Sequence, residues 1–133
     1  MRMTVKLVQV SSLQKGRFVV IEGVACKITD MQTSRPGKHG HSKIRMQAIG
    51  ITDDRKRDIV MPGHDNIEVP VIEKKSAQVL SVHGDTANVM DMETYETFDL
   101  KIPEELKGQA VEGTQVLYWI ILSDKVMKQV KVE

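Results

Sequence analysis

Apolar and polar residues alternate with a period of two along the chain, in short runs separated by turns rich in glycine, proline and aspartate. This is the period of a β-strand that places one face against a core. The predicted strands span residues 5–10, 17–21, 24–31, 43–48, 58–61, 67–72, 77–82, 86–92, 95–102, 114–122 and 125–132. In the last of these, Val126, Val130 and Val132 are expected to share one face. The pattern predicts an all-β protein.

The strands fall into two groups, separated by the polar segment Glu73–Ser76, where we expect a joint. Several short strands within 1–72 predict a small SH3-like barrel. Within 73–133, five strands are interrupted between the third and the fourth by a predicted helical turn at 103–108, which is the element order of an OB-fold. The sequence therefore predicts two domains, 1–72 and 73–133.

Charge is distributed unevenly between these domains. Residues 1–72 hold 12 Lys/Arg and 7 Asp/Glu, whereas residues 73–133 hold 7 and 11. The first domain therefore favours a polyanionic partner such as RNA, although a basic solvated surface gives the same composition. One cysteine cannot form an internal disulfide, and the longest apolar run, Leu117–Leu122, is far shorter than a membrane span. We expect a cytoplasmic protein that contacts no membrane.

The stretch Thr33–Lys43 reads T-S-R-P-G-K-H-G-H-S-K, with three bases, two histidines and no acid. It joins two predicted strands and so forms the tip of a β-hairpin. Pro36 and Gly37 favour a type II turn that presents Lys38 just past the bend. Nothing in 35–40 is β-branched or large and apolar, so no side chain there can anchor the loop to a core. We expect the tip to project into solvent.

Three kinds of chemistry concern single residues of the chain. His39 and His41 are two apart, but no Cys, Asp or Glu flanks them to complete a metal shell, so a metal site is a minor alternative. A nucleotide-binding loop is excluded, because its leading glycine is replaced by Gln32 and its Ser/Thr by His39. Cys26 lies on an apolar strand face without an adjacent histidine, which favours a core residue over a nucleophile.

The second domain contains only four aromatic residues, which are Tyr95, Phe98, Tyr118 and Trp119. OB-folds bind single-stranded nucleic acid by stacking bases on exposed aromatic rings beside a basic groove, but this domain is acidic. Tyr118 and Trp119 are adjacent on a strand, so they face opposite sides and at least one is expected in the core. Both RNA contact and protein docking remain open for this domain.

The loop is interpreted as an RNA probe, with a flexible basic hairpin tip as the simpler alternative. Its cations neutralise phosphate, its glycines allow close approach of the backbone, and its imidazoles can stack on bases or sugars. The residues expected to contact RNA are Arg35, Gly37, Lys38, His39, Gly40, His41, Lys43 and Arg45.

The same eleven residues resemble the hypusine loop of translation factor 5A, a family named as an initiation factor and the counterpart of bacterial elongation factor P. The resemblance covers the whole chain, because the family combines an SH3-like first domain that bears this loop with an OB-fold second domain. The short segment before Val5 resembles the archaeal form. Arg35-Pro36 replaces the Lys-Thr pair of the eukaryotic motif.

The resemblance implies that Lys38 is modified to deoxyhypusine or hypusine. The modifying enzyme, deoxyhypusine synthase, transfers an aminobutyl group from spermidine in an NAD-dependent reaction. The residues that match the family's motif around this lysine are Gly37, His39, Gly40, His41 and Lys43. Spermidine and NAD belong to the modifying enzyme, so no cofactor is expected for this chain.

The resemblance also implies a translation elongation factor rather than an enzyme. In the family, the loop reaches along the acceptor arm of peptidyl-tRNA toward the peptidyl-transferase centre and relieves stalls at sequences such as consecutive prolines. The expected partners are ribosomal RNA, peptidyl-tRNA and deoxyhypusine synthase, with no small-molecule substrate. The alternative is a general RNA-binding module or RNA chaperone without a ribosome-specific role.

Overall fold

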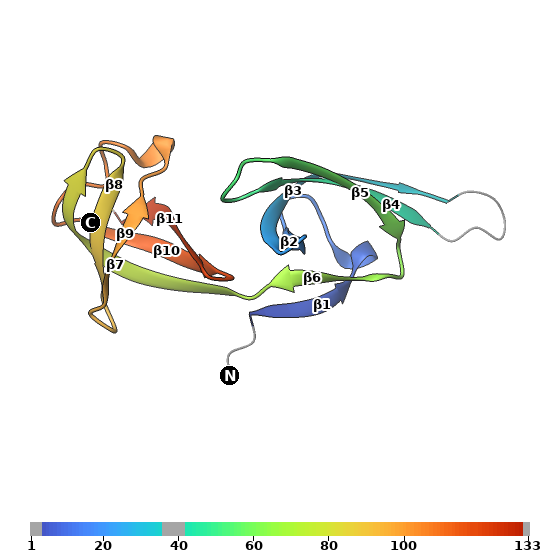
Figure 1. Ribbon diagram of the computed structural model, residues 1–133, viewed down its shortest axis with the longest axis horizontal. Helices are drawn as coiled ribbons and strands as arrows, with labels where there is room; N and C mark the ends of the chain where they lie inside the picture. The colour runs from blue at the N-terminus through green and yellow to red at the C-terminus, as the bar shows by residue number, and fades with distance from the viewer. Residues whose placement is uncertain (1–3, 36–41, 132–133) are drawn as a thin grey trace. The chain divides into compact units, whose positions relative to one another are not determined.

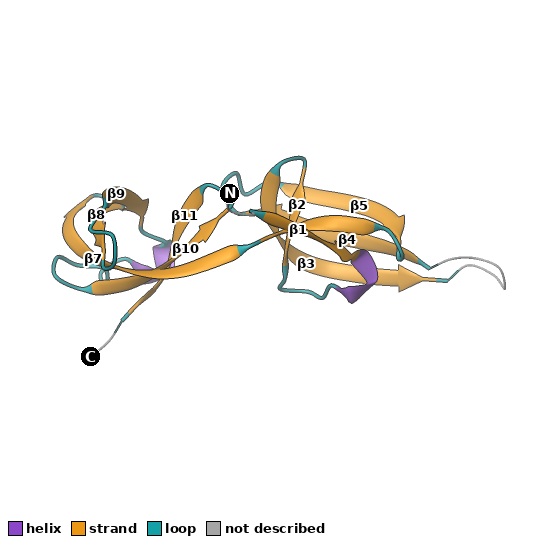
Figure 2. Ribbon diagram, turned by 90° about the horizontal axis from the view of Figure 1, so that it is seen from below, coloured by secondary structure: helices purple, strands orange, loops and turns teal. Residues whose placement is uncertain are grey.

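The structure, a computed structural model, describes residues 4–35 and 42–131. The chain divides into two compact units, Met1–Val71 (unit 1) and Ile72–Glu133 (unit 2), each with its own core (Figure 1). Strands make up most of both units, and the helical segments are short (Figure 2). The prediction of an all-β protein with two domains is confirmed.

Unit 1 is built from two small antiparallel sheets. Its elements are β1 (Val5–Gln9), the 3₁₀ helix η1 (Val10–Ser12), β2 (Phe18–Ile21), β3 (Val24–Ser34), β4 (Lys43–Gly50), β5 (Lys56–Pro62) and β6 (Asn66–Pro70). One sheet has the order β2-β3-β4-β5, and β1 pairs with β6 in the other. Both sheets contribute buried side chains to one core, as in the predicted SH3-like barrel.

The period-two pattern decides which face of β3 and β4 is buried. Cys26 and Ile28 lie in the core with Ile44 and Met46 from β4, while the alternate residues of β4 face solvent. A bulge interrupts β3, because Ile28 pairs with Ala48 and Asp30 with Gln47, which leaves Thr29 as an extra residue. The bulge turns Asp30 outward and lets Met31 pack against the core.

Unit 2 is a five-stranded barrel with one short helical segment. Its elements are β7 (Ile72–His83), β8 (Thr86–Asp91), β9 (Thr97–Lys101), the 3₁₀ helix η2 (Glu104–Leu106), β10 (Gln115–Ile121) and β11 (Asp124–Val130). The sheet order is β11-β10-β7-β8-β9, and β11 also contacts β9. The helical segment lies between the third and fourth strands, so the predicted OB-fold order is confirmed.

Two local predictions in unit 2 are wrong. Glu73–Ser76 is no joint but the first part of β7, where Lys74 pairs with Trp119 on β10. In β11 the buried residues are Met127 and Val130, so Val126 does not share the inward face with Val130, and Val132 lies outside the described residues. A bulge at Lys128 causes this second difference, because it shifts the inward face by one residue.

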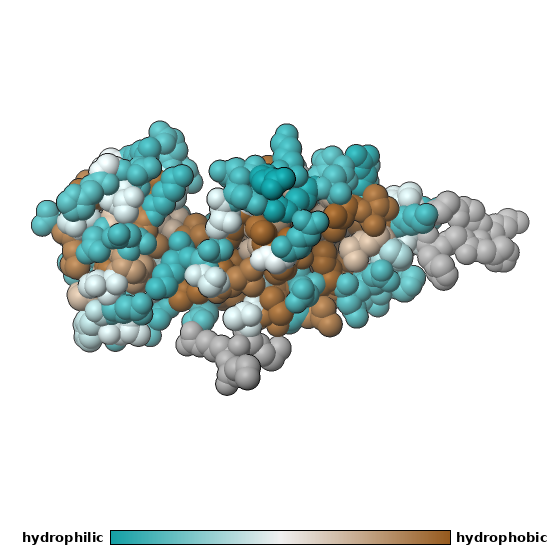
Figure 3. Space-filling view, viewed as in Figure 1, coloured by the Kyte–Doolittle hydropathy of each residue, from teal (hydrophilic) through white to brown (hydrophobic). Residues whose placement is uncertain are grey.

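On the face shown in Figure 3, hydrophilic residues cover much of each unit, with hydrophobic residues visible between them. In the part of the chain that the structure describes, no helix is long and apolar enough to cross a membrane.

Candidate functional site

The predicted hairpin is formed by β3 and β4. The two strands pair from Cys26 and Gly50 to Ser34 and Lys43, so they run side by side to where the described residues end (Figure 1). The sequence prediction of a loop on a β-hairpin is therefore confirmed for its arms. The tip residues Gly37, Lys38, His39, Gly40 and His41 lie outside the described residues.

On its C-terminal side, the loop is anchored to the rest of unit 1 by backbone hydrogen bonds. The Gly63 amide donates a hydrogen bond to the Ser42 carbonyl at 2.9 Å, and the Gly63 carbonyl accepts one from the Ser11 amide at 3.1 Å. The amide of the fully buried Val10 donates to the Asp65 carbonyl at 2.9 Å. The turn between β5 and β6 thus fixes Ser42, the residue at which the chain enters β4.

Arg45 is the described cation with the most defined geometry on the hairpin. Its Nε and Nη2 atoms donate to both carboxylate oxygens of Asp58 over 2.7–3.2 Å. The side chains are 54% and 42% exposed. Hydrogen bonding from Arg45 lowers the pKa of Asp58, and the same bonds raise the pKa of Arg45. The guanidinium is therefore held in one orientation and partly neutralised, while Lys43 and Arg35 are exposed nearby in sequence.

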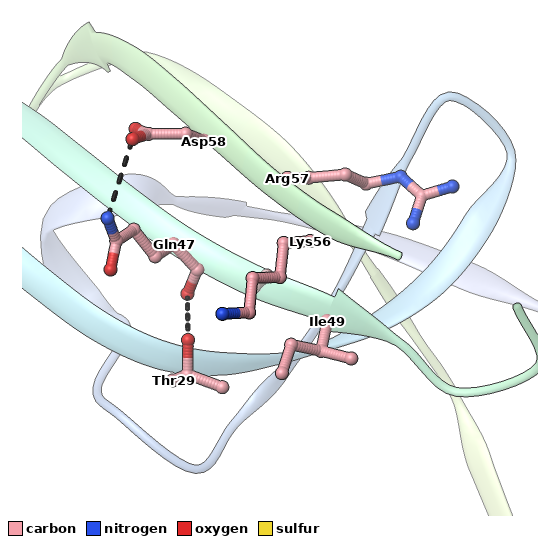
Figure 4. A pocket seen from close by; sticks show the side chains of 7 residues that line it. Thr29, Gln47, Ile49, Lys56, Arg57 and Asp58 are labelled. Carbon is pink, nitrogen blue, oxygen red and sulfur yellow. Dashed lines mark hydrogen bonds between the residues drawn. The ribbon is translucent and has the colours of Figure 1, made fainter. Parts of the chain in front are cut away.

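A shallow cavity of about 400 Å³ lies on the outer face of the same sheet (Figure 4). Its lining residues are Thr29, Gln47, Ala48, Ile49, Lys56, Arg57 and Asp58. Thr29 Oγ1 donates to the Gln47 carbonyl at 3.1 Å, and the Gln47 side-chain amide reaches Asp58 at 3.5 Å. Lys56 extends toward Gln47 in Figure 4. The cavity therefore lies next to Asp58 on the polar face of the sheet, farther along the strands from the loop than Lys43.

Sequence reasoning missed Asp58 and Lys56 as part of this face. Both belong to β5, which places Asp58 opposite Gln47 and Lys56 opposite Ile49. The alternation of Lys56 and Asp58 with Arg57 and Ile59 indicates that the two residues share one face of a strand. The alternation does not indicate which residues of β4 they pair with, because that register joins segments far apart in the sequence.

Cys26 is a packed core residue. It is fully buried, its thiol donates a weak hydrogen bond to the Val24 carbonyl at 3.3 Å, and burial raises its pKa. Nearby, Arg57 donates to Asp53 and, with the Arg55 amide, lowers the pKa of that carboxyl to about 2. A buried thiol with a raised pKa is a poor nucleophile, so the arrangement favours a structural role.

Metal ligation finds no support in the described residues. Within 4–35 and 42–131, no group of three His, Cys, Asp or Glu side chains is placed to hold a metal ion. His39 and His41, the pair considered for this role, lie outside these ranges.

The adjacent aromatic residues of unit 2 face opposite sides of β10. Tyr118 is buried in the core, where its ring lies 5.1 Å from that of Phe98. Trp119 lies on the outer face, with the ammonium groups of Lys74 and Lys128 at 5.0 and 4.8 Å from its ring centroid. The prediction that at least one of the two packs internally is confirmed.

A buried carboxylate, which the sequence did not reveal, organises the turn between β8 and β9. Asp91 is 1% exposed and accepts hydrogen bonds from the Tyr118 hydroxyl and from the Glu93 and Thr94 amides. Lys75 Nζ lies 3.5 Å from the same carboxylate. Burial alone would raise the pKa of Asp91, but these donors together hold it well below its usual range.

Family models match both units. A model described as translation initiation factor 5A-like, N-terminal, matches residues 4–65. A second, described as eukaryotic elongation factor 5A hypusine, DNA-binding OB fold, matches residues 71–131.

Individual proteins match over nearly the whole chain. A protein named translation initiation factor 5A from Methanobrevibacter smithii is 46% identical over 127 residues, which cover 95% of this chain and 98% of that protein. One of the same name from Archaeoglobus fulgidus is 50% identical over 111 residues, covering 84% and 87%. The solved structure of eukaryotic translation initiation factor 5A from Methanococcus jannaschii has a TM-score of 0.89 and 40% identity, covering 96% of both chains. The chain therefore belongs to the translation initiation factor 5A family, a family of translation factors rather than enzymes.

Proposed function

We propose that this protein is a translation elongation factor that binds the ribosome and positions peptidyl-tRNA through a modified Lys38. It would thereby promote peptide bond formation at stalling sequences such as polyproline. One observation carries the proposal: a β3–β4 hairpin, anchored at Ser42 and flanked by exposed cations, bears a hypusine-type sequence in a chain of this family.

In this proposal the arms and tip of the hairpin form one RNA contact. The cationic side chains neutralise phosphate, and the glycines allow the backbone to approach RNA closely. Asp58 holds the Arg45 guanidinium in a fixed orientation, and the Nη1 group takes no part in the bonds to Asp58. The proposed contact residues are Arg35, Gly37, Lys38, His39, Gly40, His41, Lys43 and Arg45.

The proposed modification by deoxyhypusine synthase has a direct physical use. An aminobutyl extension places a second cationic nitrogen beyond the reach of lysine. The protein would then contribute orientation and charge to a reaction that the ribosome catalyses, with no covalent step of its own. We propose that 1–72 carries this contact and that 73–133 docks the factor.

The proposal is tested with modified protein in a reconstituted translation system that synthesises consecutive prolines. Lys38→Ala is expected to abolish nearly all stimulation while ribosome binding partly survives. The comparison variant is Arg45→Ala/Asp58→Ala, which removes one proposed contact on the arm of the hairpin together with its ion-pair partner and is expected to lose only a small part of the stimulation. Equal loss in the two variants would favour a general RNA-binding module, in which each cation acts only as a phosphate contact.

A further inference from the structure

We propose that unit 2 carries a second RNA site on the outer face of β7 and β10, with Trp119 as its base-stacking residue. The ligand is a short single-stranded RNA segment, and Lys74, Lys128 and Lys131 contact its phosphates. The inference rests on the proposed function, because it assigns a further RNA contact to the same factor. We call this surface the Trp119 strip, defined by the outward residues of Lys74–Gln78 and Gln115–Trp119.

Strand register brings the residues of the strip onto one face. The facing pairs are Trp119 with Lys74, Leu117 with Ser76, and Gln115 with Gln78. Directly opposed residues of an antiparallel pair point to the same side, and residues two apart along a strand share a face. The intervening residues Val116 and Tyr118 are buried in the core. The strip is therefore a continuous outer surface of the barrel.

Trp119 lies at one end of the strip between two cations. The ring is half-buried, and Lys74 and Lys128 place their ammonium groups 5.0 and 4.8 Å from its centroid. Lys128 is the extra residue of the bulge in β11, where the register passes from Leu117–Gln129 to Tyr118–Met127. Both ammonium groups lie over the ring, so a base that stacks on Trp119 displaces one of them, and the displaced lysine then meets a phosphate of the same RNA segment.

The other end of the strip opens into a cavity of about 740 Å³. Its polar lining includes Gln78, Gln109, Thr114, Gln115 and Lys131. Each glutamine amide offers both donors and acceptors, as the edges of RNA bases do. Among the described residues that line this cavity none is acidic. Trp119 lies four steps along the extended strand from Gln115, or roughly 13 Å, which a few nucleotides can span.

The charge of the strip contrasts with that of its domain. Residues 73–133 hold 7 Lys/Arg against 11 Asp/Glu, yet two lysines lie over the Trp119 ring, and the one charged residue among the described residues that line the cavity is Lys131. OB-folds generally bind oligonucleotides on their second and third strands, which are β8 and β9 in this domain. Here β9 carries the acidic residue Asp99, which accepts a hydrogen bond from Asn88 of β8, and a carboxylate repels phosphate. An acidic peptide would also be attracted by the lysines. The stacking ring and the paired amides favour RNA.

Tryptophan fluorescence tests the proposal directly, because Trp119 is the single tryptophan of the chain. Titration of the full-length protein with a short oligouridylate is expected to quench this fluorescence saturably at low salt. The apparent affinity should fall with salt at a log–log slope of about −0.7 per lysine–phosphate contact, or about −2 for three contacts. The triple variant Lys74→Gln/Lys128→Gln/Lys131→Gln is expected to lose most of this slope.

Matched variants separate stacking from folding and from general charge. In anisotropy titrations with labelled oligouridylate, Trp119→Leu is expected to weaken binding roughly 5- to 100-fold, whereas Trp119→Phe retains most affinity. Lys101→Gln and Tyr95→Ala change an exposed cation and an exposed aromatic residue of unit 2 off the strip, so they are expected to change little. Thermal unfolding of each variant shows whether it is folded.

Three results would overturn the inference. They are RNA binding without any change in Trp119 fluorescence, equal affinity for Trp119→Leu and wild type, and quenching by an acidic peptide but not by oligouridylate, which would assign the strip to a protein partner. Failure of this inference can be distinguished from failure of the proposed function. Trp119 fluorescence reports on the strip, whereas the effect of Lys38→Ala on proline-proline synthesis does not depend on the strip.

Discussion

Two ion pairs, one in each unit, use similar groups in opposite surroundings. Arg45 and Asp58 of unit 1 are 54% and 42% exposed, whereas the side chains of Lys75 and Asp91 of unit 2 are 18% and 1% exposed. The exposed pair orients a cation on the hairpin that bears the loop. The buried carboxylate holds the β8–β9 turn through the Tyr118 hydroxyl and two backbone amides. Burial therefore decides whether such a pair acts mainly on folding or mainly on recognition.

Removal of the buried carboxylate should have the largest effect on stability. Asp91→Ala is expected to lower the free energy of unfolding of unit 2 by about 3–5 kcal/mol, since it leaves Lys75 and the Tyr118 hydroxyl without their acceptor. Urea denaturation followed by circular dichroism measures this change. Asp58→Ala, the matched change at the exposed pair, should barely shift the midpoint. Equal shifts would show that burial does not separate the two pairs.

Removal of one donor to Asp91 should have an intermediate effect. Tyr118→Phe keeps the ring that packs against Phe98 but deletes the hydroxyl. The expected loss is about 1–3 kcal/mol, because two amides and Lys75 still satisfy the carboxylate. The same denaturation experiment checks it, and its effect should largely vanish in an Asp91→Ala background. Additive losses would mean that the hydroxyl acts elsewhere.

Acid should weaken unit 2 through the same carboxylate. The donors around Asp91 hold its folded pKa below the unfolded value of about 3.9, so its contribution to stability is complete above that value and is lost as pH falls below it. Urea midpoints measured between about pH 6 and pH 2 should therefore decline more steeply for wild type than for Asp91→Asn. Parallel declines would contradict this assignment.

The smallest expected effect concerns the exposed pair and RNA. Arg45→Ala should reduce the salt dependence of RNA binding by about one phosphate contact. The accompanying loss of RNA affinity should be small. Asp58→Ala should modestly increase RNA affinity at low salt, because Arg45 is no longer partly neutralised. Filter binding at several salt concentrations measures both, and a decrease for Asp58→Ala would show that orientation matters more than charge.

Local pattern predicted much of the fold. Alternation alone placed Ile44, Met46 and Ala48 inward, and the sequence from Pro103 to Gly108 predicted the helical turn now seen at Glu104–Leu106. The loop is predicted from its own eleven residues, and the supporting hairpin, whose arms the structure confirms, from the strands on either side. These features depend on residues that are close together in the sequence, so they can be predicted from the sequence alone.

Long-range pairing accounts for what the pattern missed. A period of two does not reveal where a bulge inserts an extra residue, so the inward position of Met127 could not be predicted. Asp91 meets Tyr118, 27 positions away, only in the folded barrel. Glu73–Ser76 resembles a joint because its residues are polar, but Lys74 lies over the Trp119 ring of β10 and Lys75 lies 3.5 Å from the Asp91 carboxylate at the end of β8.

The chemical state of Lys38 tests the central claim most directly. Intact-mass measurement and peptide mapping should be made on protein purified from its native source, because a host without deoxyhypusine synthase cannot supply the modification. An aminobutyl adduct at Lys38, with or without hydroxylation, is the predicted result. An unmodified lysine at this position would contradict the account.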